Sequence, residues 1–128
     1  MNFVSKSVRR AFLPAFVAVL VLGVAPSAFA HSELVSSVPA ANESAGSSPT
    51  ELRLSFSEPV EQAFSKVKVT GPDKQPVELG KPTLDPADDK VMVVSVGKPL
   101  AKGAFVVDWS VVSSDGHKSS GRYTFDVK

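Results

Sequence analysis

The sequence contains no cysteine, one tryptophan and one tyrosine among its 128 residues. The lack of cysteine excludes disulfide bonds and thiolate metal sites, so packing alone must hold the fold together. No stripe of lysine and arginine is present, which argues against a nucleic-acid partner. The longest apolar run, Ala11 to Val24, is shorter than the ~20 residues that a membrane-spanning helix needs.

The first thirty residues have the order of features of a cleavable secretory signal peptide. A basic segment, Lys6 to Arg10, precedes the apolar run, and Ala28-Phe29-Ala30 is a small-residue cleavage site. The leader resembles bacterial signal peptides, which predicts export to the periplasm, with no membrane insertion after cleavage. An uncleaved N-terminal anchor is the alternative, but the clean cleavage site and the lack of a second apolar segment argue against it.

Cleavage at this site would leave residues 31–128, a chain of 98 residues. This length suits one small domain with a single core. Loss of the three leader cations leaves 11 basic and 13 acidic residues, so the net charge of the remaining chain is −2.

Short segments with alternating apolar and polar residues predict an all-β fold. In Glu51–Phe56 the leucines and the phenylalanine share one face of a strand. In Ala104–Val112 one face carries Phe105, Val107, Trp109 and Val111, which makes this segment the best candidate for a core strand.

Five further strands are expected at Leu34–Val35, Ser65–Thr70, Val77–Leu79, Val91–Val96 and Arg122–Lys128. The stretch Ala40–Pro49 predicts an irregular loop, and Pro59–Phe64 suits one helical turn. About seven short strands in about 100 residues predict an antiparallel Greek-key β-sandwich or small barrel.

His31 would become the first residue of the processed chain. Its α-amine and its imidazole Nδ1 would then form a chelate, in which the first donor orients the second. The only other histidine, His117, follows Asp115 by two residues. If that segment is extended, the Asp115 and His117 side chains point to one side of the strand and add a carboxylate and an imidazole.

Three nitrogen donors and one oxygen donor favour Cu(II), which prefers square-planar sites of this composition. Ni(II) or Zn(II) would bind more weakly. Cu(I) prefers sulfur ligands, and after cleavage the only methionine is Met92, in a segment expected to form a buried strand. The residues therefore predict a site for one Cu(II) ion, formed by His31, Asp115 and His117.

Other interpretations of these residues remain open. A surface histidine is often only solvated, and Asp-Gly is a common turn pair. The chain would then be a metal-free β-sandwich module that binds another protein. A copper oxidase with an N-terminal histidine is a further alternative, but the single tryptophan and single tyrosine both lie at expected core positions, which argues against an aromatic substrate surface.

The order of these features resembles the CopC family of periplasmic copper-binding proteins. The resemblance covers nearly all of residues 31–128. Four stretches carry it: His31–Ala40, Leu54–Val60, Gly103–His117 and Ser120–Phe125.

This resemblance implies an immunoglobulin-like β-sandwich that binds Cu(II) at one end and acts as a copper carrier or buffer, not as an enzyme. It assigns the ligand roles to His31, Asp115 and His117, and in some members to an acidic residue that corresponds to Glu58. It also suggests an inner-membrane partner similar to CopD. One branch of the family has a methionine-rich loop for Cu(I), which this chain lacks.

Overall fold

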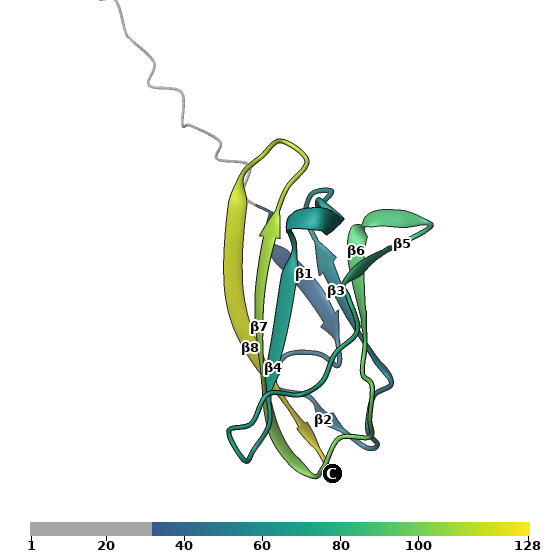
Figure 1. The fold of residues 1–128 in the computed structure, drawn as a ribbon, viewed down its shortest axis with the longest axis vertical. Coiled ribbons are helices and arrows are strands. Elements are labelled where there is room, and N and C mark those ends of the chain that lie inside the picture. Colours follow the sequence, from purple (N-terminus) through teal and green to yellow (C-terminus); the bar gives the residue numbers. More distant parts are fainter. Residues whose placement is uncertain (1–31) are drawn as a thin grey trace, which may run out of the picture.

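Two four-stranded β-sheets form the part of the chain that the computed structural model describes, residues 32–128 (Figure 1). The first sheet has the order β1 (Leu34–Val38), β3 (Glu51–Phe56), β6 (Asp88–Ser95) and β5 (Thr83–Asp85). The second has the order β2 (Ser44–Ala45), β8 (Lys118–Val127), β7 (Gly103–Val112) and β4 (Lys66–Thr70). A single 3₁₀ turn, η1 (Gln62–Phe64), joins β3 to β4. The predicted all-β sandwich is confirmed.

The core lies between the two sheets and follows the predicted alternation. All four inward residues of β7, from Phe105 to Val111, are buried, as are the apolar residues of β3 and Met92 of β6. The rings of Phe56 and Trp109 meet edge to face across the sandwich, with their centroids 5.2 Å apart. Trp109 and Tyr123 are core residues, as predicted.

Two details of the strand prediction were wrong. Residues 77–79 do not form a strand, because they make only isolated contacts, among them a bridge between Leu79 and Val96. The short strand in this region is β5, which begins directly after Pro82 and pairs with β6. The predicted loop Ala40–Pro49 contains β2, which pairs in parallel with the end of β8. Its two residues carry too little pattern to be recognised in the sequence.

The long hairpin of β7 and β8 positions residues 113–117, which include Asp115 and His117. Ten residue pairs join these strands in regular antiparallel register, from Gly103–Val127 to Val112–Lys118. The five residues between the last pair therefore form a connection at one end of the sandwich. In Figure 1 this connection, η1 and the β5–β6 hairpin lie at the same end of the molecule.

Candidate metal centre

The connection between β7 and β8 brings Asp115 and His117 together. Nδ1 of His117 lies 3.0 Å from Oδ2 of Asp115. Both side chains are about half exposed, at 52% for His117 and 46% for Asp115. A carboxylate and an imidazole thus converge at a position that solvent and ions can reach.

A tight turn produces this convergence. Gly116 has a φ angle of +88°, which favours glycine, and its N–H donates to the carbonyl of Ser113 over 2.8 Å. The N–H of Ser113 donates to the carbonyl of His117 over 2.9 Å and closes the turn. The segment is a turn, so the condition of an extended strand end is not met. Asp115 and His117 meet because the chain reverses at Gly116.

Hydrogen bonds hold the Asp115 carboxylate in its charged form. The Ser113 hydroxyl donates to Oδ1 of Asp115, and the backbone N–H of His117 donates to the same oxygen over 3.3 Å. The Ser113 hydroxyl and then the His117 side chain are the main causes that lower the pKa of Asp115 to about 2. At neutral pH Asp115 is therefore an anion whose lone pairs are available to a cation.

The beginning of the described chain lies against the start of β8. Ser32 is 1% exposed, and its carbonyl accepts a hydrogen bond from the Ser119 hydroxyl over 2.6 Å. The Ser32 hydroxyl donates to the carbonyl of Glu58 over 3.3 Å. Ser119 follows His117 by two residues, so Ser32 lies at the same end of the sandwich as the turn. His31 itself lies outside the described residues.

The loop after β3 packs beside the turn. The N–H of Ser114 donates to the carbonyl of Pro59 over 2.9 Å, and Val60 forms a β-bridge with Ser113. Glu58 is exposed on this loop. Within residues 32–128 no group of three or more His, Asp or Glu side chains could hold a metal ion, so Glu58 does not form such a group with Asp115 and His117.

Three serines that make hydrogen bonds near the turn were not singled out from the sequence. Ser32 and Ser113 are buried polar residues, and Ser119 bonds to Ser32 across 87 positions of sequence. Serine is a common turn residue, so Ser113 carries only a weak signal in the sequence. No sequence pattern reports a contact as distant as that of Ser119.

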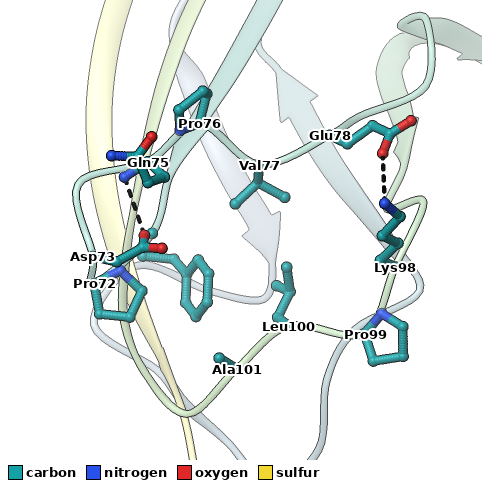
Figure 2. A pocket seen from close by; sticks show the side chains of 12 residues that line it. Pro72, Asp73, Gln75, Pro76, Val77, Glu78, Lys98, Pro99, Leu100 and Ala101 are labelled. Carbon is teal, nitrogen blue, oxygen red and sulfur yellow. Dashed lines mark hydrogen bonds and ion pairs between the residues drawn. The ribbon is translucent and has the colours of Figure 1, made fainter.

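A cavity of about 410 Å³ lies at the opposite end of β7 from the turn. Figure 2 shows Val77 and Leu100 pointing into it, and an ion pair of 3.4 Å between Lys98 and Glu78 at its edge. Its lining contains no histidine and no methionine. The cavity therefore offers copper neither imidazole nor sulfur.

No helix within residues 32–128 has the length and apolar character needed to cross a membrane.

Comparisons with known proteins identify a matching family model and several similar proteins. A family model described as the CopC domain matches residues 34–128. Protein YobA of Escherichia coli K12 is 42% identical over 105 residues, which cover 82% of this chain and 85% of the relative. Copper resistance protein C of Escherichia coli is 44% identical over 115 residues, which cover 85% of this chain and 90% of the relative.

Among solved structures, PcoC, a methionine-rich copper resistance protein from Escherichia coli, superimposes with a TM-score of 0.69 at 41% identity. The match covers 77% of this chain and all of that structure. The family model and these relatives together show that the chain belongs to the CopC family.

Proposed function

We propose that this protein is an exported Cu(II)-binding protein that carries or buffers copper in the periplasm. The observation that carries the proposal is the convergence of the Asp115 carboxylate and the His117 imidazole on an exposed turn. Imidazole nitrogen and carboxylate oxygen are suitable donors for Cu(II). The relatives named as copper resistance proteins also support a role in copper binding.

His31 completes the proposed site through its α-amine and its imidazole. Chain connectivity supports this assignment, because His31 is bonded to Ser32, which is anchored to β8 two residues beyond His117. Consecutive Cα atoms are only about 3.8 Å apart. The amine becomes available only after cleavage of residues 1–30, so export and metal binding are linked.

One Cu(II) ion is the proposed cargo, and a separate Cu(I) site is not proposed. Met92 is fully buried in the core, where its thioether packs against neighbours and cannot reach solvent. The residues near the turn supply nitrogen and oxygen donors, which suit the oxidised ion.

A carrier needs a protein that accepts the copper, and we propose an inner-membrane copper transporter similar to CopD as this acceptor.

Catalysis is not part of the proposal. The aromatic side chains of Trp109 and Tyr123 are buried, so they do not provide the broad aromatic surface on which a polysaccharide-degrading oxidase binds its substrate.

The decisive experiment compares two forms of the protein, one that begins at His31 and one with a single glycine placed before it. The glycine removes the amine chelate but leaves every side chain in place. We expect the extended form to bind Cu(II) much more weakly in a competition titration and to give a different copper spectrum. Equal binding by the two forms would refute the proposed site.

Side-chain variants separate the ligands from the alternatives. His117→Ala should weaken binding strongly, and Glu58→Gln tests whether the loop carboxylate contributes. If the protein is a metal-free interaction module, His31→Ala will not change its response to Cu(II). Added Cu(II) will then also leave the Trp109 fluorescence unquenched. Peroxide consumption by the copper-loaded protein with a sugar polymer would favour an oxidase instead.

A further inference from the structure

The proposed site draws its donors from two segments that are far apart in the chain. One is the turn from Ser113 to His117, and the other is the segment that ends at Ser32. Two serine side chains, Ser119 and Ser32, connect the second segment to β8 and to the loop after β3. A third, Ser113, makes its hydrogen bonds within the turn. Ser32 and Ser113 are each 1% exposed, although serine is usually found at the surface.

Ser113 acts on the orientation of Asp115. Its hydroxyl lies within hydrogen-bond distance of two acceptors, the Asp115 carboxylate and, at 3.2 Å, the His117 carbonyl. A hydroxyl has one proton, and a carboxylate is the stronger acceptor, so the proton goes to Oδ1 of Asp115. This bond fixes the carboxylate with Oδ2 turned toward the His117 ring.

Ser119 acts on the other segment. Its hydroxyl donates to the Ser32 carbonyl over 2.6 Å, a bond that joins the beginning of the domain to the strand that follows His117. The Ser32 hydroxyl reaches the Glu58 carbonyl and adds a second point of attachment. Ser32, the residue that follows the proposed terminal ligand, is thus held by the Ser119 side chain and by the Glu58 backbone carbonyl.

We propose that Ser113 and Ser119 are positioning residues of the copper site. Ser113 orients the Asp115 carboxylate, and Ser119 fixes the N-terminal segment beside it. This inference rests on the proposed function. Hydrogen-bond partners of metal ligands hold the ligands in binding geometry, and removing such a partner typically weakens metal affinity by about 10–100-fold.

The experiment uses the processed protein purified after export, with Cu(II) as the probe. Ser119→Ala and Ser113→Ala remove the two hydroxyls. Ser120→Ala and Ser114→Ala are the matched controls, because both serines are exposed neighbours on the same elements. Ser119→Thr keeps the hydroxyl and serves as the rescue variant. Each protein is measured by chelator competition, by the electron paramagnetic resonance spectrum of bound Cu(II), and by its metal-free melting temperature.

We expect Ser113→Ala, which removes a hydrogen-bond partner of a proposed ligand, to weaken Cu(II) binding by about 10-fold or more. Ser119→Ala should also weaken Cu(II) binding, and both variants should change the copper spectrum. The two controls and Ser119→Thr should match the unaltered protein. A purely structural role would lower the metal-free melting temperature and leave the copper spectrum unchanged. If Ser113→Ala does not fold, the comparison of Ser119→Ala with Ser119→Thr decides the question.

The inference is overturned if Ser119→Ala binds Cu(II) with unchanged affinity and spectrum. It is also overturned if Ser119→Thr fails to restore either. These failures differ from a failure of the proposed function, which would appear as weak Cu(II) binding by the unaltered protein or as normal binding by His117→Ala.

Discussion

At the scale of single residues, the environment of Asp115 differs most from that of an ordinary surface carboxylate. Two donors, the Ser113 hydroxyl and the His117 N–H, converge on one of its oxygens. The other oxygen faces the imidazole. These contacts stabilise the charged form without burying the group.

The lowered pKa of Asp115 leads to a prediction about acid. Its value of about 2 lies below the ordinary value of 3.8, so the ionised carboxylate stabilises the fold above about pH 4, and this contribution is lost as the pH falls toward 2. In an NMR titration the Asp115 carboxyl should have its midpoint near pH 2, and Ser113→Ala should move that midpoint up. A midpoint near 4 in the unaltered protein would contradict the hydrogen bonding described.

The proposed nitrogen ligands behave differently, because an α-amine and an imidazole have reference pKa values of about 7.7–8.0 and 6.5. Protons therefore compete with Cu(II) in the neutral range. We expect the affinity for Cu(II) to fall steeply below about pH 6, while Asp115 stays ionised. Chelator competition measured from pH 7 to pH 5 tests this, and a flat profile would exclude the proposed nitrogen donors.

Tyr123 gives a prediction at the alkaline end. Within residues 32–128 its hydroxyl is a buried polar atom without a hydrogen-bond partner, and burial raises the pKa of Tyr123 to about 12. The nearby Ser37 side chain lowers this pKa in part but lacks the geometry of a hydrogen bond. Because the folded value exceeds the reference of about 10, the free energy of unfolding should decrease from about pH 10 to pH 12.

Tyr123→Phe should remove this alkaline loss. At neutral pH the variant should be as stable as the unaltered protein, or more stable by up to about 1 kcal/mol, since the unpartnered hydroxyl is gone. Urea unfolding at pH 7 and at alkaline pH measures both effects. A large loss of stability at pH 7 would show that the hydroxyl has a partner after all.

At the scale of elements, the β7–β8 hairpin connects the core to the site. Trp109 and Gly121 are paired across these strands, and the indole lies over the glycine. A Cβ atom at position 121 would lie 2.5 Å from Cζ2 of Trp109. Since Trp109 also packs against Phe56, the ring cannot move away without disturbing the opposite sheet.

Gly121→Ala should therefore lower the free energy of unfolding by about 1–3 kcal/mol, the usual cost of overpacking a core. Gly46→Ala is the matched control, because no atom lies within 4 Å of a Cβ built there. Urea unfolding of both variants gives the comparison. Equal free energies of unfolding for the two variants would mean that the Trp109 indole can adopt another position without cost.

At the scale of the whole molecule, the proposed site links the two chain segments that meet at one end of the sandwich. An ion that bridges the start of the domain and the β7–β8 turn binds the folded state and not the unfolded one. Its binding energy then adds to the stability of the entire fold.

We expect free Cu(II) at 100 times its dissociation constant to stabilise the protein by about 2.7 kcal/mol at pH 7. A strong chelator should reverse this stabilisation. At the same Cu(II) concentration the stabilisation should be smaller at pH 5, because the proposed nitrogen donors take up protons. His117→Ala is the control that should show little stabilisation. Thermal unfolding with and without Cu(II) measures the difference, and an equal shift in the control would point to nonspecific binding.

The sequence by itself determined the fold class and most of the strands. Alternation is visible within a few residues, because each strand has one face on the core, as in Glu51–Phe56. It also indicated Asp115 and His117, since two donor residues of this chemistry stand two positions apart. The cleavage site and the role of His31 remain predictions.

Only the tertiary structure decided how Asp115 and His117 meet and what holds them. The positive φ of Gly116 and the backbone hydrogen bonds of Ser113 make the turn, and the Ser113 hydroxyl holds Asp115. The local sequence left both a turn at Asp-Gly and an extended strand end open. The bond between Ser119 and Ser32 spans 87 positions. Such contacts depend on how the sheets pack, so no local pattern of residues specifies them.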